Sequence, residues 1–257
     1  MASASAKERP DLSTVGAEAI LTWLPGLDLE GLAQLLRNPA LSERHVVALL
    51  KQPSVRADVL TRIHQARSLS KNYQVRVALA NHPDTPRVLA LELVHQLFWR
   101  DLLRLSENLR LHPHVRRSAE QILGETSESL TLGEKIALAR VATRAIILAL
   151  RKESDPKVVE ALLQNPRLVE EDILFMASRP AVPAHVLRQI GTNGKWATRY
   201  PVRLALARNP NTPPGVALSF LSSLSEADLR TLTNLPAVPP LVREGARNVL
   251  GALAARR

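Results

Sequence analysis

The chain has 257 residues, of which 46% are apolar and only 3% aromatic. This composition excludes wholesale disorder, and the abundance of Leu, Ala and Val favours closely stacked helices. The absence of cysteine excludes disulfides, thiolate metal sites, iron–sulfur clusters and a cysteine nucleophile. The net charge of +10 rests on 27 arginines and 7 lysines. The basic charge indicates an acidic partner such as nucleic acid, and the alternative is a genome-wide preference for arginine over lysine.

Residues 1–27 predict an N-terminal arm and a capping helix. Residues 1–16 are polar, without the apolar core of a secretory signal, and favour a flexible arm. A helix is expected near residues 17–24, where Pro25-Gly26 ends it. No segment approaches the roughly 18 apolar residues of a membrane-spanning helix. We therefore expect a cytoplasmic, soluble protein with no membrane partner.

The rest of the chain contains one block twice. A shift of 127 positions places residues 28–124 on residues 155–251 without a gap, and about 34 of the 97 pairs are identical. Four prolines keep this register, since Pro39, Pro53, Pro83 and Pro113 fall on Pro166, Pro180, Pro210 and Pro240. The pattern predicts an internal duplication of helical repeats.

Within the first block, apolar residues recur at helical spacing, and proline steps interrupt them. Leu32, Leu35 and Leu36 illustrate the spacing. Proline removes an amide donor and pushes the preceding residue out of the helical region, while Asn or Asp before it can cap the next helix. Steps such as Asn38-Pro39 and Asp155-Pro156 therefore predict sharp corners between short helices.

Residues 125–154 connect the blocks and predict one bridging helix from about Thr131 to Lys152. Its sequence is apolar on most sides, which favours a buried spacer. Residues 252–257 form a short basic tail. Since nothing flexible separates the copies, we expect one continuous superhelix with a shared interior.

The strings VRVALANHPDTP (75–86) and VRLALARNPNTP (202–213) carry a family resemblance. They resemble the leucine-rich repeat variant, a short bacterial repeat similar to HEAT-like helical repeats. The resemblance covers most of both blocks and implies an all-α fold, a right-handed α-solenoid in which α- and 3₁₀-helices alternate. A known member of that family carries a cysteine-ligated iron–sulfur cluster, which a chain without cysteine cannot hold. The family implies interaction surfaces and no shared chemistry.

A row of arginines is the first candidate binding feature. An arginine follows a valine in four of the short sequence repeats, at Arg76, Arg116, Arg203 and Arg243. On an exposed face the row would bind phosphates or acidic groups. The alternative is an internal ladder, in which each guanidinium binds the adjoining turn.

Two matched loops, residues 64–74 and 191–201, are the second candidate. They combine basic and aromatic residues, at Lys71, Tyr73, Lys195, Trp196, Arg199 and Tyr200. Such residues suit single-stranded nucleic acid or an anionic peptide when exposed. The alternative is that both tyrosines plug the end of the following helix.

No motif indicates an enzyme, a cofactor or a metal site. The histidines lack metal-binding spacing, and His82 and His112 precede prolines as corner residues would. Trp99 and Asp101 raise a distant alternative, a HEAT-like DNA glycosylase of the alkylpurine type. We expect a non-enzymatic scaffold that holds a protein partner on a curved face, with a nucleic-acid-binding solenoid as the alternative.

Overall fold

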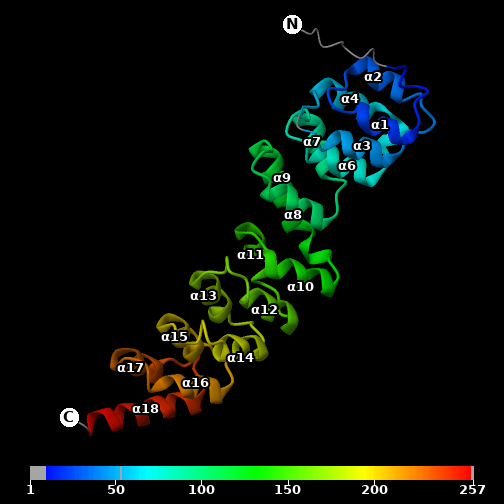
Figure 1. Cartoon of the computed structure of the whole chain (residues 1–257). Coiled ribbons are helices and arrows are strands. Elements are labelled where there is room, and N and C mark those ends of the chain that lie inside the picture. The colour runs from blue at the N-terminus through cyan, green and yellow to red at the C-terminus, as the bar shows by residue number, and fades with distance from the viewer. Residues whose placement is uncertain (1–9, 53, 256–257) are drawn as a thin grey trace. The chain divides into compact units, whose positions relative to one another are not determined.

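The computed structural model describes residues 10–52 and 54–255, and this part of the chain is helical, without strands. The all-α class expected from the sequence is confirmed. Contacts divide the chain into two compact units, residues 1–125 and 126–257. The first unit contains α1 Ala17–Trp23, α2 Leu29–Leu35, α3 Glu43–Leu50, α4 Ala57–Gln65, α5 Arg67–Ser70, α6 Tyr73–Ala80, α7 Arg87–Val94, α8 Trp99–Glu107 and α9 Pro113–Thr126 (Figure 1).

The second unit repeats this pattern of short helices. It contains the 3₁₀ turn Ser127–Ser129 and then α10 Leu132–Val141, α11 Arg144–Leu150, α12 Pro156–Leu163, α13 Glu170–Ser178, α14 Ala184–Thr192, α15 Tyr200–Arg208, α16 Pro214–Leu221, α17 Glu226–Asn234 and α18 Pro240–Ala254. Residues 252–254, the start of the expected basic tail, therefore belong to α18.

The helices recur under the same shift that aligns the two sequence blocks. Four helices of the first unit, α1, α4, α7 and α8, have counterparts at which both ends obey that shift: α11, α14, α16 and α17. The helices α2, α3, α6 and α9 also begin at positions equivalent to the starts of α12, α13, α15 and α18. The short α5 is the exception, because residues 194–198 form turns. The recurrence begins at α1, earlier than the sequence match at residue 28.

Within each unit the helices form two layers. In the second unit α13 packs on α15 and α15 on α17, while α10, α12, α14, α16 and α18 follow one another in the other layer (Figure 1). In the first unit α1, α3 and α6 pack in succession, and α2 packs on α4. Apolar side chains between the layers make the core, among them Leu60 and Leu79, which are fully buried. The right-handed superhelix and the interior shared by both copies stay predictions.

Buried amides hold the corners together. The side chain of Asn38 donates to the carbonyls of Leu12 (2.7 Å) and Val15 (2.9 Å). Asn165, at the equivalent position of the second sequence block, donates to the carbonyls of Ala139 (2.8 Å) and Ala142 (3.1 Å). The accepting carbonyls are equivalent too, so the whole arrangement is repeated. Buried backbone carbonyls need hydrogen-bond donors. The side-chain amides of Asn38 and Asn165 therefore hold the turns at residues 12–15 and 139–142 in place.

The bridging segment is not the single helix expected over residues 131–152. It is two helices, α10 and α11, separated at Ala142 and Thr143. Ala142 leaves the helical region at φ −52° and ψ 135°, and its carbonyl turns to accept from Asn165. A continuous helix would withhold that carbonyl, so the tertiary hydrogen bond overrides the local apolar pattern.

Residues 10–16 do not belong to the flexible arm that was expected over residues 1–16. Residues 1–9 lie outside the described part, but Leu12 is fully buried and its amide donates to Gln34 Oε1 at 3.0 Å. The apolar side chain of Leu12 and the bonds to its backbone tie this segment to α2 and the corner that follows. The polar composition of residues 1–16 gave no indication that Leu12 is buried.

One buried position carries an ionisable group in both units. His45 in the first turn of α3 is fully buried, and its Nδ1 accepts from the amide of Ser42 at 3.1 Å. Burial, with the nearby Arg44 charge, lowers the pKa of His45 below its ordinary value.

The second unit has Asp172 at the position of His45, again fully buried. Its carboxylate pairs with Arg144 and with Arg151, the latter at 3.4 Å. The first unit has Ala17 and Leu24 where these arginines lie. The aspartate and its two guanidiniums therefore occur together, and the histidine occurs without them.

Candidate binding surface

The arginines of the predicted row lie partly inside their units. Arg76 on α6 donates to the carbonyl of Lys71 at 3.4 Å and to Gln96 Oε1 at 3.0 Å. Arg203 on α15 donates through Nε to the carbonyl of Ala197 at 2.7 Å. Both side chains are half-buried. Each guanidinium thus ties its helix to the turn before it, which is the ladder alternative weighed from the sequence.

Arg116 on α9 and Arg243 on α18 are half-buried as well. Their Nε atoms are buried and have no hydrogen-bond partner within the described residues. Each of these side chains therefore lies partly inside its unit, and only part of it faces solvent.

The two tyrosines brace a helix further along the chain, α8 for Tyr73 and α17 for Tyr200. The Tyr73 hydroxyl donates to Asp101 Oδ2 at 2.6 Å and accepts from the amide of Phe98 at 3.0 Å. Burial, followed by the hydrogen bond to Asp101, raises the pKa of Tyr73 to about 12. The Tyr73 ring also packs against Phe98, with 4.7 Å between centroids.

Tyr200 makes the same two kinds of bond at the equivalent position of the second unit. Its hydroxyl donates to Asp228 Oδ2 at 2.5 Å and accepts from the amide of Ser225 at 3.0 Å. The hydrogen bond from Tyr200 is the main cause that lowers the pKa of Asp228. Each tyrosine hydroxyl is therefore engaged at the start of α8 or α17, two helices beyond its own, whereas the sequence alternative placed the tyrosines at the end of the following helix.

Asp101 is engaged by Tyr73 and by Arg104, whose Nη1 lies 3.4 Å from it. Its side chain is only 15% exposed. The glycosylase hypothesis requires an open carboxylate in a cleft beside an exposed tryptophan, and Trp99 is half-buried. We do not propose that activity.

In the second loop, Trp196 is only 3% exposed, so its ring faces cannot stack on a ligand. Lys195 lies over the ring, with Nζ 4.2 Å from the centroid. The neighbouring glycine and lysine suggested exposure, but Trp196 occupies the inward position that corresponds to Leu69. Lys71, Lys195 and Arg199 are exposed, and Arg199 lies 3.9 Å from Glu170.

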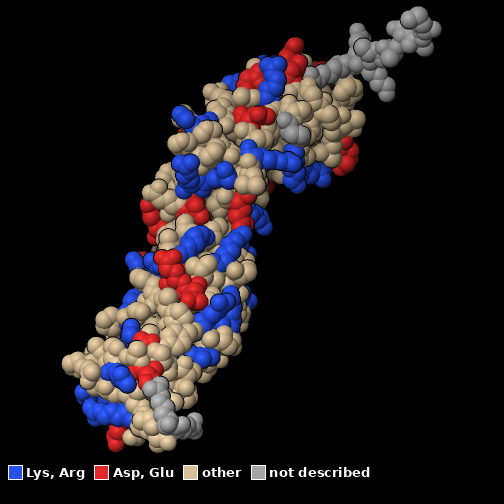
Figure 2. Space-filling view, turned by 90° about the vertical axis from the view of Figure 1, so that its left-hand side faces the viewer, with Lys and Arg blue, Asp and Glu red and all other residues tan. Residues whose placement is uncertain are grey.

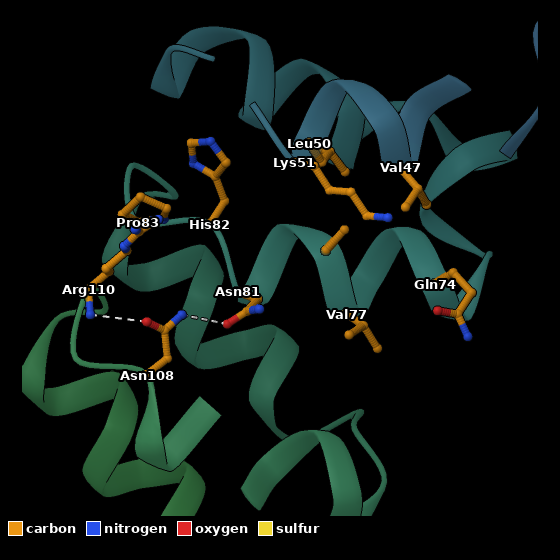
Figure 3. A pocket seen from close by; sticks show the side chains of 11 residues that line it. Val47, Leu50, Lys51, Gln74, Val77, Asn81, His82, Pro83, Asn108 and Arg110 are labelled. Atoms are coloured by element: carbon orange, nitrogen blue, oxygen red, sulfur yellow. Dashed lines mark hydrogen bonds between the residues drawn. The ribbon is translucent and has the colours of Figure 1, made fainter. Parts of the chain in front are cut away.

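The surface between α3 and α6 contains a groove of about 340 Å³, which was not among the features expected from the sequence. We call it the α3–α6 groove. Its aliphatic floor is formed by Val47, Leu50, Val77 and Ala78. Figure 3 shows Gln74 at one end and Asn108 with Arg110 at the other, while Lys51 extends from α3 toward α6.

A hydrogen-bonded chain closes one end of the groove. Asn108 Nδ2 donates to Asn81 Oδ1 at 2.7 Å, and the amide of Arg110 donates to Asn108 Oδ1 at 3.0 Å (Figure 3). These bonds involve Asn81 Oδ1 and not the hydrogens on Asn81 Nδ2. The groove therefore combines an apolar floor with fixed polar ends, as ligand sites do.

The second unit has a groove of about 440 Å³ between α13 and α15. We call it the α13–α15 groove. Its lining residues Leu174, Ser178, Leu204, Ala205, Arg208 and Asn209 are the equivalents of Val47, Lys51, Val77, Ala78, Asn81 and His82 in the α3–α6 groove. The apolar floor is thus repeated, whereas the polar groups differ.

A signal for these grooves is present in the sequence. On α6, Val75 and Leu79 are buried in the core, but Val77 and Ala78 are apolar too. A helix that buries one face needs a single apolar stripe, so the additional residues indicate a second contact surface. Periodicity alone does not separate them from core residues, which is why the groove was missed.

Charges of both signs are mixed on the surface. Figure 2 shows Lys and Arg side chains interspersed with Asp and Glu on the face that it displays. Among the described residues, no group of three His, Asp or Glu side chains is arranged to hold a metal ion. Within the same residues, no helix has the length and apolar character needed to cross a membrane.

No model of a known protein family matches this chain, and no curated protein or solved structure matches it either. The resemblance to the leucine-rich repeat variant stays a prediction.

Proposed function

We propose that this chain is a non-enzymatic helical-repeat scaffold that binds a protein partner through the grooved surfaces of its units. The observation that carries the proposal is the recurrence of one apolar-floored groove at equivalent positions in both units. Exposed apolar surface beside polar groups is typical of protein-binding sites. Helical-repeat proteins use surfaces of this kind for partners.

An internal duplication is part of this proposal. It is supported by the helix ends that recur at equivalent positions and by the matched corner amides Asn38 and Asn165. The paired bonds of Tyr73 and Tyr200 support it further. Shared tertiary bonds are stronger support than shared composition, because each requires two positions to correspond.

Nucleic acid is the second candidate, favoured by the net charge of +10. The buried ring of Trp196 weakens it, because single-strand binding relies on exposed aromatic faces. If this candidate holds, binding to single-stranded DNA or RNA weakens steeply as salt rises.

Photo-crosslinking in the native cell tests the proposal. A photoreactive amino acid is placed at Gln74 in the α3–α6 groove and at Ser178 in the α13–α15 groove. The controls are the exposed positions Arg62 on α4 and Arg188 on α14, in the other helix layer. We expect discrete polypeptide adducts from the groove positions only. Equal labelling at the control positions, or adducts to nucleic acid alone, would contradict the proposal.

A further inference from the structure

The two grooves have equivalent apolar floors but different polar groups. This difference indicates which class of partner the α3–α6 groove can bind. The α3–α6 groove presents Lys51, Gln74, Asn81 and Arg110, and none of its lining residues is acidic. The corresponding residues of the second unit are Ser178, Pro201, Arg208 and Ala237. Arg208 is already paired with Asp228 at 3.1 Å.

We propose that the α3–α6 groove binds an extended, acidic peptide segment of a protein partner, with an aliphatic side chain on the floor. This inference rests on the proposed function and specifies the class of partner. Lys51 and Arg110 are exposed and have no ion pair among the described residues. They are therefore available to carboxylates of the peptide.

The amide groups favour an extended main chain. Asn81 Oδ1 is occupied by Asn108, so the Asn81 amide hydrogens can donate to a peptide carbonyl. Gln74, at the other end of α6, offers both a donor and an acceptor. A helical ligand has no free main-chain groups in its middle, whereas an extended one has them at every residue.

The dimensions agree with a short contact. Gln74 and Asn81 are seven residues apart on α6, which corresponds to about 10 Å at the rise of an α-helix. An extended chain covers that length with about three residues. One aliphatic side chain on the floor, flanked by acidic residues near Lys51 and Arg110, fits this span.

The floor argues against nucleic acid as the occupant. It consists of Val47, Leu50, Val77 and Ala78, and no aromatic residue lines it. Bases bind single-strand sites by stacking on aromatic rings, and an aliphatic floor offers no such face. Aliphatic peptide side chains, in contrast, gain from burial there.

Selection from a display library of random 12-residue peptides on the full-length chain tests the inference. We expect enrichment of peptides that carry two or more acidic residues around Leu, Ile or Val. The double variant Lys51→Glu with Arg110→Glu should bind the enriched peptides at least tenfold more weakly. The control Arg62→Glu with Arg87→Glu changes the same charge in the same unit outside the groove and should stay within twofold.

Two further readouts keep the test decisive. Thermal unfolding of both double variants shows whether the fold is intact, and Asn81→Ala should weaken binding without altering the preference for acids. No enrichment, enriched peptides without acids, or equal binding to the groove variant would each overturn the inference. If the double variant Lys51→Glu with Arg110→Glu loses binding to oligo(dT) or poly(U) and not to peptides, the groove is assigned to nucleic acid. Crosslinks at Gln74 would still support the scaffold in the first three cases, so the two proposals fail separately.

Discussion

His45 lies in a pocket that tolerates only its neutral form. The ring is fully buried, and Nδ1 accepts a hydrogen bond from the amide of Ser42, which requires that nitrogen to be unprotonated. Arg44 on the same helix disfavours a second charge, while Glu18 on α1 is a smaller, opposing influence. The lowered pKa of His45 therefore links stability to pH.

We expect the first unit to lose stability as the pH falls below about 6.5, the ordinary pKa of histidine. The pKa of His45 is lowered by folding, so the unfolded chain binds the proton first and its population grows on acidification. Urea unfolding at pH 7.5 and pH 5.5 measures the effect. His45→Gln retains an acceptor at this helix position and should reduce the difference. An unchanged difference in that variant would contradict the assignment.

Tyr73 predicts a change at the alkaline end. Its folded pKa of about 12 lies above the ordinary value of 10.0, so its contribution is complete below pH 10 and is lost as the pH rises through 12. In the Tyr200→Phe background Tyr73 is the sole tyrosine. Ultraviolet absorbance should then show ionisation near pH 12. A midpoint near pH 10 would contradict the burial of Tyr73 and its hydrogen bond to Asp101.

At the scale of elements, the corners matter more than helix propensity. Asn165 is almost fully buried, and both its donors and its acceptor are used, the latter by the amide of Arg167 at 2.8 Å. Removing the amide deprives the buried carbonyls of Ala139 and Ala142 of this donor and the Arg167 amide of this acceptor.

Asn165→Ala should therefore destabilise the second unit by about 2–3 kcal/mol, because each unpaired buried group costs about 1–3 kcal/mol. Chemical denaturation measures the loss. The control Asn234→Ala removes an exposed amide from the end of α17 and should change stability by less than about 0.5 kcal/mol. Similar losses in both variants would show that the corner bonds contribute little.

Sequence periodicity anticipated the helices and their proline corners because these are local properties. It placed α1 within one residue, and the shift of 127 positions relates the starts of eight helices in each unit. It failed at residues 131–152, where the break depends on an amide 23 residues away. It also failed to find the grooves, since Val77 and Ala78 have the composition of core residues and only packing shows them on a surface.

At the scale of the molecule, the two compact units predict two unfolding events. Leu79 and Leu206 are fully buried, occupy equivalent positions and belong to different units. Leu→Ala at such positions costs about 2–5 kcal/mol. Each substitution should lower the midpoint of its own unit more than that of the other.

Calorimetry with tryptophan fluorescence measures this prediction, because Trp196 reports on the second unit. Leu206→Ala should shift the fluorescence transition of Trp196 in a background where Trp23 and Trp99 are replaced by Phe. Leu79→Ala should leave that transition nearly unchanged. Equal shifts from both substitutions would indicate one cooperative unit, as in a strongly coupled repeat array.

The buried Asp172 limits the order in which substitutions at this position can accumulate. The Arg144 side chain is 44% exposed and can exist at little cost before it has a partner, whereas Arg151 is only 19% exposed. An aspartate that arrives first is buried without a counter-charge, which costs several kcal/mol. A lineage that exchanges histidine for aspartate here must therefore acquire an arginine beforehand, and the viable mutational path has a fixed order.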